Sequence, residues 1–337
     1  MIIKKMPKIL KLVLSLNIFF LTNLYSSEVD FNTWLKNFKI EAINSGISKN
    51  VVNDVMSEAK FLPKVIEYDR YQPEFYEDTF TYIKKRSSKK KIKDGLKLYK
   101  REKIIIDKVA NEFQVEKELL LALMGIETNY GKYLGKMDII SSLATLSFDK
   151  RRSQFFTDEL LILLNLVDKK IIDKKILFGS WAGAFGNFQF MPSTIQSYAI
   201  DYNNNTKIEL KKIDDSFASA ANYINKIGWK PNSPCFINIK LKSNIPQKYL
   251  NTSARKLKNK RKVKYLKKYL ENSNDYLNYD NMLAAIITPD KDIIPGSNNL
   301  KPAYLVFSNY ELILKWNRSL RFALAVCTLK DKFKNEI

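Results

Sequence analysis

Apolar and polar residues alternate along most of the chain with the spacing of amphipathic helices. The segment 30–46 opens with Asp30 as a candidate N-cap, places apolar side chains three or four positions apart from Phe31 to Phe38, and closes at Gly46. The same spacing predicts one long charged helix or a pair over about 80–113. Further helices are predicted over 115–128, 153–168, 192–201, 214–229 and 310–329. In contrast, prolines interrupt the segment 61–75, which is expected to be extended.

The pattern changes after Trp229. Short runs rich in β-branched and aromatic residues, at 234–241, 282–290 and 302–309, are separated by turn residues and by one very basic helical stretch. This predicts a mainly α protein with a small α/β insertion. The expected organisation is a signal peptide at 1–27, an N-terminal helical segment at 28–100, a helical core at 101–230, the insertion at 231–307 and a C-terminal helix at 308–337 that packs back on the core.

The first 27 residues have the pattern of an export signal. Four lysines precede the apolar stretch 12–21, and small residues follow it around Ser26. The stretch is shorter than the ~20 residues of a membrane-spanning helix, and no cysteine follows that could carry a lipid. We expect cleavage near Ser26 and an exported, periplasmic protein that associates peripherally with the envelope. An uncleaved anchor is the alternative.

Composition excludes several classes of chemistry. The chain has 337 residues, of which 45% are hydrophobic, so it can build a globular core. It contains no histidine, which excludes Ser/His/Asp and Cys/His catalysis and histidine-ligated zinc. Acid–base chemistry therefore depends on carboxylates, lysine or tyrosine. Cys235 and Cys327 are too distant for a CxxC motif and too few for a disulfide scaffold, so both a disulfide and free thiols are open.

The formal net charge is +22, a value that would suit a nucleic-acid partner. Export argues against such a partner. The densest basic clusters, 84–97 and 255–268, are most simply solvated helix faces or loops. A cationic surface still slightly favours an anionic cell-wall polymer or lipid head-group layer.

One carboxylate has an unusual position. The predicted helix 115–128 is apolar on nearly all sides from Leu119 to Ile126, and Glu127 follows in its last turn. Burial and the helix macrodipole both disfavour an anion there, so both should raise the pKa of Glu127. Such a group could act as a general acid, as the buried glutamate of lysozyme does. A glutamate that caps or pairs with a neighbouring element is the alternative.

Later segments add residues suited to sugar binding. Glycines and aromatic residues alternate over 179–198, where they enclose the polar Ser180 and Gln189. Glycine lets backbone approach a ligand, and aromatic faces suit the C–H surfaces of sugars. Arg151 and Arg152 could clamp a carboxylate or form a plain surface pair, and Tyr223 could belong to the core.

Together and in this order, four segments resemble the lytic murein transglycosylase B family. They read "GIETNYGKYLGKMDIISSLATLSFDKRRSQFF", "GSWAGAFGNFQFMPSTIQSYAIDYN", "ASAANYINKIGW" and "NYELILKWNRSLRFALAV". The resemblance is nearly continuous over 119–229, returns over 309–326, and is thin before residue 100 and through the insertion. It implies a lysozyme-like helical catalytic core.

The resemblance also implies a reaction. Members of the family cleave the β-1,4 bond between N-acetylmuramic acid and N-acetylglucosamine in peptidoglycan, and a single glutamate protonates the glycosidic oxygen and then serves as base towards the muramoyl C6 hydroxyl. The product is a 1,6-anhydro sugar. A hydrolase would need a second carboxylate at about 5 to 9.5 Å. Within the four matched segments no other acid stands beside Glu127, and the nearest one there, Asp138, belongs to a separate loop.

Carried over position by position, Glu127 matches the catalytic residue of the family. The residues that match substrate-binding positions are Ser180, Gln189, Arg151, Arg152, Tyr223 and Asn317. Two positions depart from the family pattern, because Trp316 and Phe322 stand where members often carry tyrosine. Tryptophan and phenylalanine keep an aromatic surface for stacking at these two positions, but they lack the hydroxyl of tyrosine.

The loop 201–212 aligns with an EF-hand-like cation loop found in some members. Asp201, Asn203 and Asn205 occupy its first, third and fifth positions. A functional loop favours glycine at the sixth position and a carboxylate at the twelfth, where this chain has Thr206 and Lys212. We therefore expect neither a bound metal nor any other cofactor.

The expected partner is the glycan strand of peptidoglycan and not nucleic acid. We expect a monomer, with proteins of cell-wall synthesis or remodelling as further candidate partners. Two alternatives stay open: a lysozyme-like muramidase, which is a hydrolase, and a non-catalytic peptidoglycan-binding or scaffolding protein that keeps the fold. A secreted polyanion binder has no support from the motifs.

Overall fold

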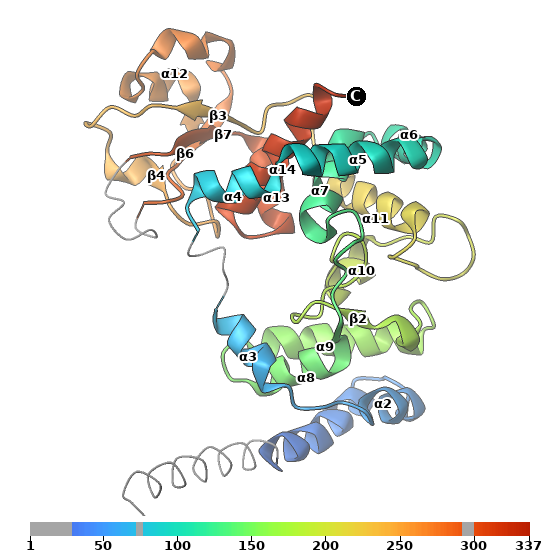
Figure 1. The fold of residues 1–337 in the computed structure, drawn as a ribbon. Helices are drawn as coiled ribbons and strands as arrows, with labels where there is room; N and C mark the ends of the chain where they lie inside the picture. The colour runs from blue at the N-terminus through green and yellow to red at the C-terminus, as the bar shows by residue number, and fades with distance from the viewer. Residues whose placement is uncertain (1–28, 72–76, 292–299) are drawn as a thin grey trace, which may run out of the picture. The chain divides into compact units, whose positions relative to one another are not determined.

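The computed structural model describes residues 29–71, 77–291 and 300–337 (Figure 1). They form two compact units, which are described separately. Unit 1 contains residues up to Arg70 together with Lys136–Ala184 and Met191–Ser193. Unit 2 contains Tyr71–Gly135, Phe185–Phe190 and Thr194–Ile337. The expected signal segment lies outside the described residues. None of the helices within the described ranges is long and apolar enough to cross a membrane.

Unit 1 is built from helices around an aromatic core. Its elements are the helical residues 29–44, α2 (Lys49–Met56), α3 (Pro63–Arg70), β1 (Met137–Asp138), α8 (Ile139–Phe148), α9 (Ser153–Asp168) and β2 (Phe178–Gly179). Phe148 contacts the rings of Phe31 and Phe61 edge-on, each with a centroid distance of 5.6 Å. The two short strands pair antiparallel, with Met137 opposite Gly179. Helices α8 and α9 pack against each other (Figure 1).

Two parts of unit 1 differ from the sequence prediction. The segment 61–75 was expected to be extended, but α3 begins at Pro63. Proline is favoured at the first position of a helix, where its missing N–H costs nothing, so here it starts a helix instead of preventing one. Helix α8 carried no amphipathic signal because its residues from Ile139 to Ser147 are all buried. It begins at Asp138, whose carboxylate accepts the N–H of Ser141 at 2.6 Å.

The helices of unit 2 surround α7 (Lys117–Thr128). They are α4 (Thr79–Arg86), α5 (Lys89–Arg101), α6 (Lys103–Glu112), α11 (Ile213–Lys226), α13 (Ser308–Trp316) and α14 (Leu320–Lys334), and α10 (Pro192–Tyr198) enters from unit 1. Helix α14 packs against α7 (Figure 1). Leu119 to Gly125 of α7 are all buried, as predicted from the apolar run.

The sequence prediction underestimated the number of helices in unit 2. The segment 80–113 forms three helices, since the Ser88 side chain accepts the N–H of Lys91 and starts α5, while Glu102 separates α5 from α6. The single C-terminal helix is also two. Helix α13 ends at Trp316, and the Ser319 hydroxyl accepts the N–H of Phe322 to start α14.

A small sheet forms in the segment predicted as an α/β insertion. Its strands are β3 (Phe236–Ile239), β4 (Leu250–Asn251), β5 (Arg261–Lys262), β6 (Leu283–Ile287) and β7 (Ala303–Val306), in the order β3-β7-β6-β4 with β5 on β6. Strand β7 runs antiparallel to both β3 and β6. A short helix, α12 (Val263–Leu266), contributes Val263 and Leu266 to the apolar core beside the sheet.

Residues 136–184 lie in unit 1 with the N-terminal helices, and most of the other residues of the segment 101–230 lie in unit 2. The division of the chain into an N-terminal segment, a catalytic core at 101–230, an insertion and a C-terminal helix stays a prediction. The mainly α fold class with a small sheet is confirmed by the elements above.

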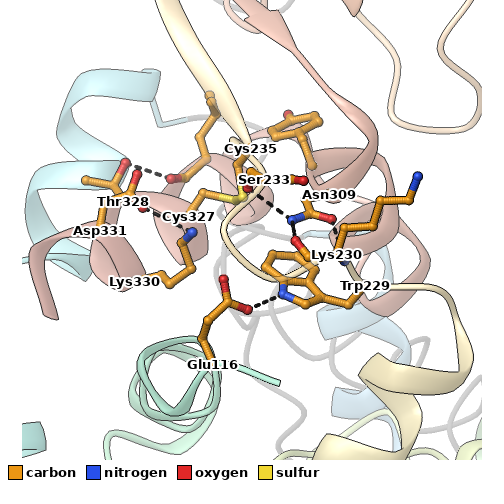
Figure 2. The surroundings of a disulfide bond; sticks show 12 residues. Glu116, Trp229, Lys230, Ser233, Cys235, Asn309, Cys327, Thr328, Lys330 and Asp331 are labelled. Carbon is orange, nitrogen blue, oxygen red and sulfur yellow. Dashed lines mark hydrogen bonds and ion pairs between the residues drawn. A yellow bond between two sulfur atoms is a disulfide. The ribbon is translucent and has the colours of Figure 1, made fainter. Parts of the chain in front are cut away.

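A disulfide joins the start of the sheet to α14 within unit 2. Cys235 and Cys327 are bonded, with 6.1 Å between their Cα atoms, so the question that the sequence left open is answered. Figure 2 shows Asn309 beside this bond, where its amide donates to the carbonyl oxygens of Lys230 and Ser233. The Trp229 indole N–H donates to Glu116, the residue before α7. These contacts fix the sheet to the helices of unit 2.

Candidate active site

Glu127 lies in the last turn of α7, which ends in a tight left-handed turn. Asn129 has φ +50° and caps the helix by donating its N–H to the carbonyl of Gly125, while the N–H of Tyr130 donates to the carbonyl of Met124. The Thr128 hydroxyl donates to the carbonyl of Asn187 at 2.8 Å and accepts the N–H of Gly131 at 3.1 Å. The helix end that carries Glu127 is therefore held against the loop 185–190.

An indole N–H reaches the Glu127 carboxyl from the end of α13. Trp316 Nε1 donates to Glu127 Oε1 at 2.9 Å. The Trp316 ring stacks on Tyr223 with centroids 5.1 Å apart and planes at 18°, and Phe190 contacts it edge-on at 5.3 Å. The Tyr223 hydroxyl donates to the carbonyl of Lys315 at 3.2 Å. Because its ring is packed on two sides, Trp316 can hold its N–H in one direction.

Burial raises the pKa of Glu127 to about 7, against an ordinary value of 4.5. The hydrogen bond from Trp316 acts in the opposite direction, because it favours the charged form. Close to neutral pH the carboxyl is therefore protonated in a large fraction of molecules. Burial also raises the pKa of Tyr223 to about 12, so its hydroxyl stays a hydrogen-bond donor. The sequence predicted a raised pKa for Glu127, and the structure gives a shift in the same direction.

The loop 185–190 places Gln189 in unit 2 with Glu127. Phe185 and Phe190 bond through both backbone N–H groups, at 3.1 and 3.0 Å, and close the loop. Gln189 has φ +49°, and its amide donates to the carbonyls of Gly186 at 3.0 Å and Leu134 at 3.2 Å. The amide nitrogen of Gln189 therefore stabilises the loop, and its oxygen is the atom free to meet a ligand.

Gly186 is expected to be intolerant of substitution. It has φ +80°, and an added Cβ would lie 2.5 Å from Leu210 Cβ and 2.7 Å from the Leu210 carbonyl oxygen. Gly186→Ala should lower the free energy of unfolding by about 2 to 4 kcal/mol, since backbone strain and overpacking add. Urea unfolding followed by circular dichroism measures this.

Gly228→Ala is the matched control for that measurement. Gly228 has φ +96°, but no atom lies within 4 Å of its added Cβ, so only the backbone strain of about 1 kcal/mol remains. Equal losses of stability in the two variants would contradict the close packing of Gly186 against Leu210.

Three predicted binding residues belong to unit 1. The Ser180 hydroxyl oxygen accepts the N–H groups of Ala182 at 3.3 Å and Ala184 at 3.0 Å, so its proton remains available for donation. Arg151 donates to Asp69 Oδ2 at 2.7 Å, and Arg152 pairs with Oδ1 of the same carboxylate. The two arginines do clamp a carboxylate, but it is an internal one.

The Asp69 carboxylate is buried at 2% exposure. Burial acts to raise its pKa, but the hydrogen bonds and charges of Arg151 and Arg152 outweigh burial and hold the pKa below its ordinary value. Sequence analysis did not single out Asp69. It stands 82 residues before Arg151, and nothing local marks it as their partner.

Of the predicted residues, the structure brings Glu127, Gln189, Tyr223 and Asn317 into unit 2, and places Ser180, Arg151 and Arg152 in unit 1. Asn317 follows Trp316 directly and ends α13, with its backbone N–H on the carbonyl of Ile313 at 3.0 Å. Sequence reasoning noted Trp316 only for a missing hydroxyl and overlooked its N–H. Phe322, the other departure, is buried at 4% exposure.

Among the described residues, burial and the Trp316 N–H are the groups that shift the pKa of Glu127, and no carboxylate is among them. Asp138, the acid nearest to Glu127 within the four matched segments, accepts the N–H of Ser141 and caps α8 in unit 1. A conventional glycosidase uses a pair of carboxylates on opposite sides of a bond, whereas the Asp138 carboxylate is engaged in this cap.

In the loop 201–212 the candidate metal ligands make hydrogen bonds to other groups of the chain. The Asp201 carboxylate accepts the N–H groups of Asn205 and Thr206 at 3.0 and 2.6 Å. The amides of Asn203 and Asn205 donate to Asp214 and Glu209, at 2.8 and 2.9 Å. Calcium needs six to eight oxygen ligands, whereas here the twelfth position is Lys212. In the part of the chain that the structure describes, no cluster of three Asp, Glu or Cys side chains is arranged to hold a metal.

Comparison with known proteins shows what this chain is similar to. Membrane-bound lytic murein transglycosylase B of Escherichia coli K12 is 30% identical over 194 residues, which cover 55% of this chain and 54% of that protein. The match thus spans about half the length of this curated relative. The solved structure of SltB3 from Pseudomonas aeruginosa, in complex with NAG-NAM-pentapeptide, has a TM-score of 0.78 at 29% identity, over 90% of this chain and 79% of that one.

A second solved structure is that of the Escherichia coli lytic transglycosylase SLT35 in complex with calcium. Its TM-score is 0.72 at 25% identity, over 90% of this chain and 93% of that one. The family model for the transglycosylase SLT domain matches residues 30–331. With nearly the whole chain matched by that model, the protein belongs to the transglycosylase SLT domain family.

Proposed function

We propose that this protein is a lytic transglycosylase that cleaves the β-1,4 bond between N-acetylmuramic acid and N-acetylglucosamine in peptidoglycan. The observation that carries the proposal is the half-buried Glu127 carboxyl, which has a pKa raised to about 7 and is oriented by the Trp316 N–H. Membership of the family supports the same reaction, and two relatives carry the name lytic transglycosylase.

The proposed reaction needs one proton donor and no water. Glu127 gives its proton to the glycosidic oxygen as the bond from C1 of the muramic acid breaks. The C6 hydroxyl oxygen of the same sugar then bonds to C1, and its proton passes to the Glu127 carboxylate. The products are a 1,6-anhydromuramoyl end and a free 4-hydroxyl, and Glu127 regains its starting form. A pKa near neutrality suits a residue that must be acid first and base second.

Several side chains are proposed to hold the sugars. The half-buried Trp316 ring lies beside Glu127 and is the type of surface that suits the C–H faces of sugar rings, while the buried Tyr223 ring stacks between Trp316 and Tyr198 and supports it. The Gln189 amide oxygen and the Ser180 hydroxyl proton are the polar groups left for hydrogen bonds to a substrate. We propose Asn317, Arg151 and Arg152 as further cleft residues, the two arginines acting through the segment that their pairing with Asp69 fixes.

We propose an exported, periplasmic location at the envelope. The disulfide between Cys235 and Cys327 supports this, because disulfides persist in oxidising compartments and are rare in the cytosol. The lysine-rich and then apolar N-terminal sequence supports export as well. Peripheral attachment is compatible with the membrane-bound character in the name of the Escherichia coli relative. The proposed partner is the glycan strand of peptidoglycan. We propose that the enzyme is a monomer.

The test is mass analysis of what purified protein releases from isolated sacculi. Muropeptides that end in 1,6-anhydromuramic acid are the expected product. Fragments with reducing muramic acid ends would show a muramidase instead. Binding to sacculi without any soluble fragment would favour a scaffolding protein.

The pH dependence should report Glu127 directly. Because only the protonated carboxyl can donate, kcat/KM on sacculi should fall as the pH rises through about 7. In Trp316→Phe the ring still stacks but the N–H is lost. Since that hydrogen bond lowers the pKa of Glu127, its removal raises the pKa, and the fall should move to higher pH. A fall at the same pH in both proteins would contradict the role of Trp316.

A further inference from the structure

A cavity of about 520 Å³ lies beside the end of α13 that carries Trp316. One wall is the segment 254–257, and another is α13 with the turn after it, up to Arg318. The buried side chains of Leu257 and Leu314 form part of the lining. The cavity is distinct from the Glu127 carboxyl and belongs entirely to unit 2.

The cavity lining is strongly cationic. Its basic residues are Arg255, Lys256, Lys315 and Arg318, and all four are exposed. The one acid in the lining, Glu311, already pairs with Lys260 at 2.8 Å. None of the four cations forms an ion pair with any residue in the described ranges 29–71, 77–291 and 300–337. Four like charges around one hollow repel each other and raise the local concentration of anions.

The segment 315–318 connects the cavity to Glu127. Lys315 and Arg318 line the cavity, while Trp316, between them, donates its N–H to Glu127 at 2.9 Å. The Tyr223 hydroxyl fixes the same segment by donating to the Lys315 carbonyl at 3.2 Å. The cavity and the Glu127 carboxyl are therefore joined by the same short segment of unit 2.

We propose that this cavity binds the carboxylates of the peptide that muramic acid carries, with Arg255 and Arg318 as specificity-determining residues. The inference rests on the proposed function. Arginine pairs with carboxylate through two parallel hydrogen bonds, and the apolar part of the lining suits a peptide better than a bare phosphate. The volume also exceeds what a single inorganic anion needs. The SltB3 complex shows that a relative binds a sugar that bears a pentapeptide.

Two substrates that differ only in charge test this. Both are oligomers of the NAG-NAM-pentapeptide unit, one with free carboxylates and the other with the same carboxylates amidated. For the wild type, kcat/KM should be about tenfold higher on the free carboxylates. Arg255→Gln combined with Arg318→Gln should reduce that ratio to about twofold or less.

Lys93→Gln combined with Lys97→Gln is the control, because it removes the same charge from the exposed face of α5. It should keep the wild-type ratio. An unchanged ratio in the arginine variant, with 1,6-anhydro products still released, would overturn this inference alone. If the kcat/KM ratio between the two substrates also fell in the lysine variant, net charge alone would explain the preference. That result would overturn the inference as well. If the wild type released 1,6-anhydro products from neither substrate, the proposed function would fail, and the inference with it.

Discussion

Glu127→Gln should reduce the release of 1,6-anhydromuropeptides from sacculi by about 10³-fold or more. General acid–base groups contribute about 10² to 10⁴ to a rate, and here one residue serves both halves of the reaction. The amide keeps the shape of the carboxyl, and its oxygen can still accept the Trp316 N–H. It cannot donate a proton of the required acidity. Product release measured by mass spectrometry after fixed times gives the ratio.

Stability measurements on the same variant show whether the loss is chemical. The pKa of Glu127 rises from 4.5 to about 7 on folding, so the folded state holds the proton more tightly than the unfolded chain. The resulting stability is fully present below about pH 4.5 and is lost as the pH rises through about 7. Glutamine does not titrate. The wild type should therefore lose stability relative to Glu127→Gln across this range, on the order of 3 kcal/mol.

Glu118→Gln is the matched control on the same helix. Glu118 lies in the first turn of α7, where a carboxylate is favoured by the helix dipole and costs only about 0.5 kcal/mol to remove. Its activity should equal that of the wild type. Wild-type product release by Glu127→Gln would refute the single-glutamate mechanism.

Loss of the disulfide should strongly destabilise the protein. Cys235 and Cys327 are 92 residues apart in sequence, and a bridge that closes a loop of this length contributes about 4 to 5 kcal/mol in the chain-entropy model and about 2 to 5 kcal/mol by experiment. The variant with both cysteines changed to serine should lose that free energy of unfolding. Urea titration in oxidising buffer measures it.

Reducing agent supplies the control for this prediction. Dithiothreitol should destabilise the wild type by the same amount and leave the double serine variant unchanged, because the chain has only two cysteines. If the two proteins unfolded at the same urea concentration without reductant, the bridge would contribute nothing.

The parts of the fold that the sequence predicted are those with a local signal. The run from Leu119 to Ile126 is apolar on all sides, which predicted a buried helix, and α7 is buried from Leu119 to Gly125. The position of Glu127 at its end, and the direction of the pKa change, followed from the same run. The sequence pattern after Trp229 was equally informative, because its runs of β-branched and aromatic residues form the strands β3, β6 and β7.

Features that depend on partners distant in the chain could not be predicted. Trp316 meets Glu127 across 189 residues, and Arg151 meets Asp69 across 82. Tertiary packing alone sets such pairs, so no pattern within a short window contains them. Pro63 shows a different limit, because proline both ends and begins helices, and the surrounding residues decide which.

The contact between Trp316 and Glu127 also has a consequence for the order in which the protein is made. Glu127 is synthesised before the indole that orients it, which follows 189 residues later, and before the cysteine that anchors α14. A nascent chain therefore contains the acid long before it contains the surroundings that tune it. The site can be completed only after α13 has been synthesised and has brought Trp316 to Glu127.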